Sequence, residues 1–162
     1  MKRTLVLVRH GKSSWEQGLP DRARPLAERG LRDAPLMGAR LAHDKVRPDL
    51  ILSSPASRAL STAHIMAEVL GYPPGEIVTD ERLYGSDAGA LLAVLGELGD
   101  GFRCVMLFGH DPEFTELAHR FSGKITRMPT CAVARFTFNA PSWSVAVSQK
   151  PLTAVFDYPK KG

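Results

Sequence analysis

Three short, uninterrupted apolar runs alternate along the chain with longer segments in which apolar residues recur every three or four positions. The runs cover residues 5–8, 50–52 and 104–108. Apolar runs of this length are typical of strands buried on both faces, and the intervening periodicity is typical of helices. The alternation predicts an α/β fold of three layers, a three-layer sandwich in which helices cover both faces of a mainly parallel central sheet.

The helical periodicity predicts four helices, at residues 26–42, 55–70, 87–98 and 112–121. Pro35 lies in the first of them and is expected to be tolerated only near its first turns, because proline lacks the amide hydrogen that an interior turn needs. Asp87 is the predicted cap of the third helix. Shorter apolar stretches predict a short edge strand at residues 77–79 and a further strand at 132–138, and another apolar stretch lies around 152–156. The sequence contains no internal repeat or linker, so we expect a single domain spanning residues 1–162.

Composition and charge narrow the classes of ligand. The chain has 162 residues, of which 44% are apolar, which is enough for a substantial core. The net charge is +4, and residues 1–64 hold 12 Lys/Arg and 6 Asp/Glu, whereas residues 65–162 hold 9 and 11. A positive field in the first part suits an anionic ligand, such as a phosphorylated group, nucleic acid or an acidic protein face. The few aromatic residues are not interleaved with the basic ones, which argues against nucleic-acid binding.

The chain shows no membrane segment and no disulfide pattern. No apolar run approaches the roughly 18 residues that a spanning helix needs, and the basic N-terminus lacks the other features of a signal peptide. We therefore expect a cytoplasmic protein with no membrane partner. Cys104 and Cys131 are expected to be buried free thiols. Neither is followed six residues later by arginine, so the loop of the thiol phosphatases is absent.

Cationic or titratable residues follow each of the three predicted buried strands. Arg9 and His10 follow the first, Arg58 lies in the helix after the second, and His110 follows residues 104–108. Because ligands of open α/β sheets bind at the carboxyl ends of the strands, we expect these side chains to converge there. Arginine offers a fork of donors to phosphate oxygens, and neutral imidazole can attack phosphorus. The sequence therefore predicts a site for phosphoryl chemistry.

Three motifs, in this order, resemble the histidine phosphatase superfamily, which has the phosphoglycerate mutase-like fold. The motifs are Arg9-His10-Gly11, the Ser-Ser-Pro-x-x-Arg-Ala segment that contains Arg58, and Gly109-His110-Asp111-Pro112. The resemblance covers nearly the whole chain. Within the superfamily, the short length and the opening Arg-His-Gly-Lys-Ser-Ser-Trp are most similar to the SixA-type phosphohistidine phosphatases.

The resemblance implies a mechanism with a covalent intermediate. His10 would attack phosphorus and become a phosphohistidine, which water then hydrolyses. Arg9, Arg58 and His110 would neutralise the phosphoryl oxygens as charge rearranges. The resemblance implies neither a metal nor another cofactor.

The proton donor for the leaving group is left open by the motifs. In many superfamily members a glutamate between the second and third motifs has this role. Glu81 matches it in one alignment, whereas in another the position falls on Gly85. The alternative role of Glu81 is that of a surface carboxylate paired with a cation. Three residues of the polar loop after His10 are candidates either for lining the phosphate pocket or for a solvated surface: Lys12, Ser13 and Arg22.

Three functions remain open at this stage. The connector at residues 71–86 is too short to form a lid, so we expect an open site that admits a protein-borne phosphate. This favours a phosphatase acting on phosphohistidine of a protein. The alternatives are a phosphatase of small phosphoesters with broad specificity and a non-catalytic module that uses the same basic pocket to bind a phosphorylated protein or nucleic acid.

Overall fold

A six-stranded mixed sheet forms the centre of the fold in the computed structural model, which describes residues 1–15 and 18–161. The sheet order is β3-β2-β4-β1-β5-β6. Strands β3, β2, β4 and β1 run parallel, and β5 is antiparallel to both β1 and β6. The predicted α/β class with a mainly parallel sheet is confirmed. The strands are β1 (Lys2–Arg9), β2 (Leu50–Ser53), β3 (Val78–Thr79), β4 (Cys104–Gly109), β5 (Val133–Asn139) and β6 (Thr153–Asp157).

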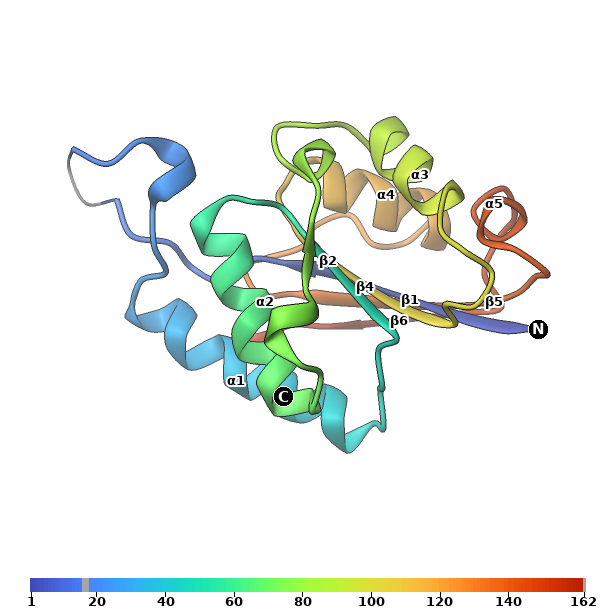
Figure 1. Ribbon diagram of the computed structural model, residues 1–162, viewed down its shortest axis with the longest axis horizontal. Helices are drawn as coiled ribbons and strands as arrows, with labels where there is room; N and C mark the ends of the chain where they lie inside the picture. Colours follow the sequence, from blue (N-terminus) through green and yellow to red (C-terminus); the bar gives the residue numbers. More distant parts are fainter. Residues whose placement is uncertain (16–17, 162) are drawn as a thin grey trace.

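Helices cover both faces of the sheet (Figure 1). Two of them, α1 and α2, lie on one face, and α3, α4 and α5 lie on the other. Four of the five were predicted, whereas the fifth is too short to show a period in the sequence. The helices are α1 (Glu28–His43), α2 (Ser57–Leu70), α3 (Ala88–Gly96), α4 (Glu113–Ser122) and α5 (Trp143–Ala146).

The apolar run of β1 is explained by the two layers of helices. Leu5 and Leu7 are fully buried in the cluster formed with α3, α4 and α5, whereas Val6 and Val8 are fully buried in the cluster formed with α1 and α2. Successive side chains of a strand point to opposite faces, so both sets must be apolar. Burial of each such side chain contributes about 1.5–3 kcal/mol. This packing fixes the position of β1 and therefore also the position of its carboxyl end.

The predictions for Pro35 in the first long helix and for the Asp87 helix cap have different outcomes. Pro35 lies in the interior of α1, beyond the first turns that begin at Glu28, so the expected restriction to the first turns is wrong. Packing of Ala34 and Met37, which are buried against the sheet, keeps the helix continuous although proline removes one backbone hydrogen bond. The cap at Asp87 is confirmed, because its carboxylate accepts a hydrogen bond from the Ala90 amide at 2.8 Å.

Both cysteines are free thiols, as predicted, but only Cys131 is buried as expected, whereas Cys104 near the start of β4 is partly exposed. Burial raises the pKa of Cys131 to about 12 and that of Cys104 to about 11. In the part of the chain that the structure describes, no helix has the length and apolar character needed to cross a membrane. The cytoplasmic location stays a prediction.

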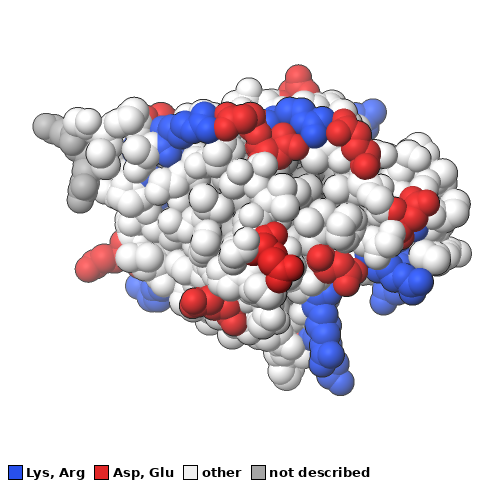
Figure 2. Space-filling view, in the orientation of Figure 1, with Lys and Arg blue, Asp and Glu red and all other residues white. Residues whose placement is uncertain are grey.

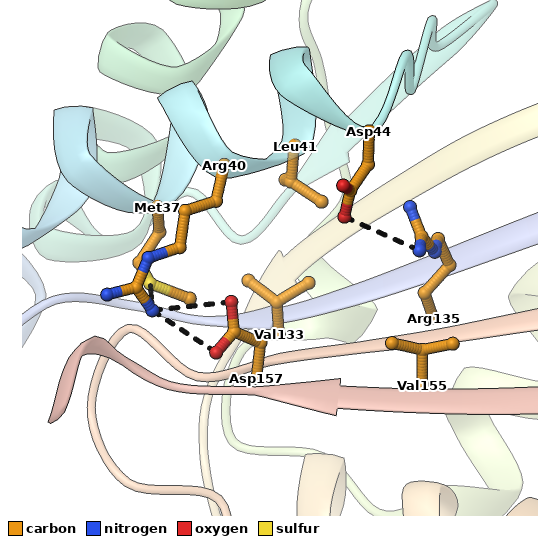
Figure 3. A pocket seen from close by; sticks show the side chains of 8 residues that line it. All are labelled: Met37, Arg40, Leu41, Asp44, Val133, Arg135, Val155 and Asp157. Atoms are coloured by element: carbon orange, nitrogen blue, oxygen red, sulfur yellow. Dashed lines mark hydrogen bonds and ion pairs between the residues drawn. The ribbon is translucent and has the colours of Figure 1, made fainter. Parts of the chain in front are cut away.

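A small cavity lies between α1 and the β5–β6 pair (Figure 3). Its volume is about 20 Å³, which is room for about one water molecule. The charged groups at its rim are paired: Arg40 contacts Asp157 at 3.2 Å, and Arg135 contacts Asp44 at 3.6 Å. None of the predicted site residues lines this cavity.

Candidate active site

The carboxyl ends of β2, β4 and β1 meet at one edge of the sheet. In the register of the strands, Arg9 lies opposite Gly109 and Ser53 lies opposite Phe108. The pairing continues past the strand ends, since the amide of His10 donates to the carbonyl of Gly109 at 3.0 Å. The residues that follow these strands are therefore neighbours, as the sequence predicted.

His10 is held as a neutral imidazole with a defined tautomer. Its Nδ1 lies 2.7 Å from the carbonyl oxygen of Gly11. Because a carbonyl only accepts, Nδ1 carries the hydrogen and Nε2 keeps a free lone pair. Burial lowers the pKa of His10 to about 3, and the charges of His110, Arg58 and Arg9 add to this effect. Its imidazole therefore has the form that a nucleophile requires.

His110 faces His10, with ring centroids 5.1 Å apart. Its Nε2 lies 2.8 Å from the Ser54 hydroxyl, which itself accepts from the Ala56 amide at 3.1 Å. The hydroxyl proton is free to be donated to Nε2, and in that arrangement the ring hydrogen of neutral His110 is on Nδ1. Burial lowers the pKa of His110 to about 4, and Arg58 lowers it further.

The two arginines are anchored by their outer nitrogens. Arg58, which is only 7% exposed, donates from Nη1 to the backbone oxygen of Asp21 at 2.8 Å and from Nη2 to Oδ2 of the same residue at 3.1 Å. Arg9 donates from Nη1 to the Met128 carbonyl at 2.8 Å and lies 3.8 Å from Asp111. Arg58 is thus held through both terminal nitrogens and Arg9 through Nη1, and the Nε of each guanidinium has no hydrogen-bond partner.

Within the described residues, only three buried side-chain nitrogen or oxygen atoms lack a hydrogen-bond partner. They are Nε of Arg9, Nε of Arg58 and Nδ1 of His110. A buried donor without an acceptor costs about 1–3 kcal/mol, so three of them around one histidine indicate a place for an acceptor-rich ligand. No side chain caps the N-terminus of α2 among the described residues, so its amides also favour an anion there. A phosphoryl group has the oxygens and the charge to meet these donors.

Close backbone packing supports the segment after His10. A Cβ on Gly30 of α1 would lie 2.4 Å from the Lys12 carbonyl oxygen, and a Cβ on Gly11 would lie 3.0 Å from Gly30 Cα. The Gly11 amide donates to the Thr62 hydroxyl of α2 at 3.1 Å. The close approach of α1 therefore favours glycine at the position after His10.

The central cluster of the site consists of four residues: Arg9, His10, Arg58 and His110. The other predicted site residues lie outside it. Lys12 is exposed, and the Ser13 hydroxyl accepts from Arg24 at 2.9 Å. Arg22 donates to the exposed carboxylate of Glu81 at 2.9 Å, and this pairing lowers the pKa of Glu81. Figure 2 shows basic and acidic side chains alternating along one edge of the molecule, so the positive charge there is balanced.

Three residues near the site were not assigned a role from the sequence. Asp21 contacts Arg58, the Tyr84 ring lies edge-on to His110 at 5.5 Å, and Ser54 holds the His110 ring. In the sequence, Asp21 is an acidic residue inside a basic loop. This pattern does not show which cation it pairs with. Among residues 1–15 and 18–161, no group of His, Cys, Asp and Glu is arranged to hold a metal ion.

Comparison with known proteins agrees with this geometry. The model of the histidine phosphatase superfamily (branch 1) matches residues 5–93, which include three of the four central side chains. The chain belongs to the histidine phosphatase superfamily. An uncharacterized protein of Mycobacterium tuberculosis is 36% identical over 112 residues, which cover 68% of this chain and 67% of that protein.

Two further relatives indicate the range of activities in the superfamily. The crystal structure of a putative phosphohistidine phosphatase SixA from Agrobacterium tumefaciens has a TM-score of 0.75 and 27% identity, and covers 83% of this chain and 90% of its own. A 2,3-bisphosphoglycerate-dependent phosphoglycerate mutase of Methylobacterium sp. is 38% identical over 96 residues, or 56% of this chain and 45% of the mutase. Family membership and the SixA likeness support phosphatase activity.

Proposed function

We propose that this histidine phosphatase removes the phosphoryl group from phosphohistidine on a protein. The observation that carries the proposal is the set of three buried, unpaired nitrogens of Arg9, Arg58 and His110 beside a neutral His10. The set supplies a nucleophile and three donors to the phosphoryl oxygens, without a step that depends on a metal.

The reaction proceeds in two displacements. Nε2 of His10 attacks phosphorus while the bond between phosphorus and the substrate imidazole breaks. The substrate ring reacts in the form protonated on its other nitrogen, so the bonding electrons leave with the ring as neutral histidine. Water then attacks phosphorus, and the bond to Nε2 of His10 breaks. The products are inorganic phosphate and the neutral His10 imidazole. The N–H groups of Arg9, Arg58 and His110 stabilise the charge on the phosphoryl oxygens in both steps.

The state of two carboxylates, Asp21 and Glu81, supports a nitrogen leaving group. A hydrogen bond from Tyr84 and pairing with Arg58 hold the pKa of Asp21 at about 2, and Arg22 lowers the pKa of Glu81. Both are therefore ionised at neutral pH and are poor proton donors. An alkoxide leaving group depends on a proton donor, whereas an imidazole nitrogen departs more readily without one. The likeness to a structure described as a SixA phosphohistidine phosphatase points to the same substrate.

The proposal is tested with two substrates and two variants. The purified protein is incubated, without added metal, with a phosphohistidine-bearing carrier protein and separately with a small phosphoester. We expect phosphate release from the carrier at a higher kcat/KM, and loss of at least about 1000-fold in H10A, because the nucleophile is removed. H43A is the matched control, because His43 is exposed at the end of α1.

Brief exposure to substrate followed by mass spectrometry is expected to show an acid-labile phosphate on His10. Equal turnover by wild type and H10A would contradict the mechanism. Release from the phosphoester alone would contradict the substrate and favour a phosphatase of small phosphoesters. Phosphate binding without turnover of either substrate would favour a binding module.

A further inference from the structure

Asp21 meets three side chains from separate parts of the chain. Its Oδ2 accepts from Nη2 of Arg58 at 3.1 Å and from the Tyr84 hydroxyl at 2.7 Å. Its Oδ1 accepts from Nε of Arg24 at 3.2 Å, and its backbone oxygen accepts from Nη1 of Arg58 at 2.8 Å. One residue thus occupies both terminal nitrogens of Arg58.

We propose that Asp21 is a positioning residue that orients Arg58 for the phosphoryl group. This inference rests on the proposed function, since it gives Arg58 the role of a phosphoryl ligand. With Nη1 and Nη2 engaged on the Asp21 side, the remaining Nε–H is buried and has no protein partner. The guanidinium therefore presents its Nε edge to the site, in the company of the equally unpaired nitrogens of Arg9 and His110.

Asp21 is itself held in place, although its side chain is 51% exposed. Arg24, which fixes its Oδ1, is 6% exposed and donates to the Ser13 hydroxyl at 2.9 Å. The guanidinium carbon of Arg24 also lies 3.5 Å from the centre of the exposed Trp15 ring. A carboxylate anchored in this way can fix a long arginine side chain, which otherwise samples many rotamers.

The hydrogen bond from Tyr84 extends this arrangement to the second histidine. Tyr84 follows the 3-10 turn Glu81–Leu83, and its ring lies edge-on to His110 with centroids 5.5 Å apart. Asp21 therefore links the loop after β1, the first turn of α2 and the segment that flanks His110. This one carboxylate therefore contacts Arg58 directly and also bonds the tyrosine whose ring flanks His110.

The experiment measures binding of inorganic phosphate to the full chain by calorimetry, which needs no turnover. We expect D21A to raise the Kd for phosphate about 10-fold, since displacement of a positioned group by a fraction of an ångström has effects of this size. D21N keeps one acceptor oxygen for Arg58 and Tyr84, so we expect a partial rescue, with Kd raised about 3-fold. Y84F loses only the bond to Oδ2, and a rise of about 2-fold is expected.

D157N is the matched control, because Asp157 also pairs with an arginine, Arg40 at 3.2 Å, but lies at the cavity of Figure 3. We expect its Kd to equal that of wild type, and thermal unfolding of each variant shows that it is folded. If D21A and D21N bind phosphate as tightly as wild type or more tightly, Asp21 competes with phosphate and does not orient Arg58, and the proposal is wrong. If D21A fails to fold, the phosphate Kd values of D21N and Y84F are used instead, and values equal to or below that of wild type would contradict the proposal.

The test of the positioning role of Asp21 can fail or succeed independently of the test of the proposed function. Weak phosphate binding by D21A in a protein that does not hydrolyse phosphohistidine would keep the positioning role and reject the substrate. Hydrolysis by wild type with unchanged phosphate binding in D21A and D21N would keep the function and reject the positioning role. If the protein is active, we expect kcat/KM to be lower in D21N than in wild type and lower still in D21A.

Discussion

His10 and His110 lie 5.1 Å apart between ring centroids, with their planes inclined by 58°. Both are neutral because of burial, but their hydrogen-bond partners differ. The Gly11 carbonyl leaves a lone pair on Nε2 of His10, whereas the Ser54 hydroxyl, when it donates to Nε2 of His110, leaves an N–H on Nδ1 of that ring. One ring is thus prepared to attack phosphorus and the other to donate to a phosphoryl oxygen.

The first prediction concerns the titration of this pair. Burial places the pKa of His10 at about 3 and that of His110 at about 4, against 6.5 for an unperturbed histidine. In NMR titrations of the free protein, the imidazole signals of both residues are expected to stay at their neutral positions from pH 8 down to about pH 5. Midpoints near 6.5 for both residues would contradict the burial and the charges described above.

The same shifts give a pH dependence of stability. Between the folded pKa values and 6.5, the unfolded chain binds more protons than the folded one, so the free energy of unfolding rises with pH in this window. The contribution of the two histidines is present above about pH 6.5 and is lost as the pH falls toward 4. Urea unfolding at pH 7.5 and pH 5 measures it. H10A is expected to lose less stability than wild type over that interval, because one of the two groups is gone.

The second prediction concerns the support of His110. S54A removes the hydroxyl that lies 2.8 Å from Nε2, so the ring is free to exchange tautomers and to rotate. We expect kcat/KM to fall about 10-fold, a size consistent with loss of orientation of one stabilising group. S53A is the control, since the adjacent Ser53 is also fully buried but its hydroxyl donates to the Ser54 carbonyl. Nitrogen chemical shifts of His110 that are the same in S54A and wild type would count against this role.

The parts of the site that could be predicted from the sequence are those fixed by the sheet. Arg9, His10 and His110 directly follow apolar runs, and the parallel register brings strand ends together whatever the loops do. Asp21 could not be predicted, because its contacts with Arg58 and Tyr84 span 37 and 63 residues and depend on how an irregular loop folds back. Helix α5 was missed because four residues carry no period. Pro35 shows packing prevailing over local propensity, which a sequence pattern does not measure.

The third prediction concerns Glu81, the candidate proton donor. Its side chain is 69% exposed and pairs with Arg22, which lowers its pKa. E81Q is therefore expected to change kcat/KM for a phosphohistidine protein by less than about 3-fold, as is usual for an exposed ion pair. A loss of about 100-fold or more, with the basic limb of the pH profile removed, would instead identify Glu81 as the general acid. R22Q is the companion variant, since it removes the same ion pair and leaves the carboxylate.

The fourth prediction tests the packing beneath the segment that carries His10. In G30A the new methyl group would lie 2.4 Å from the Lys12 carbonyl oxygen and 3.0 Å from the Lys12 amide nitrogen. Both are backbone atoms, and the same carbonyl accepts from the Ala27 amide at 2.8 Å, so the clash cannot be relieved by turning a side chain. The free energy of unfolding is expected to fall by about 1–3 kcal/mol.

Because residue 12 lies two positions from His10, displacement of this backbone should also reduce kcat/KM. The control is G96A at the end of α3, where the nearest atom to the new methyl group is Ser144 Cα at 4.0 Å. That change is expected to be neutral or to stabilise the protein by up to about 1 kcal/mol, because alanine restricts the unfolded chain and favours the helix. Urea unfolding of the three proteins separates the two outcomes. If G30A is as stable and as active as G96A, the close approach of α1 does not hold the loop in place.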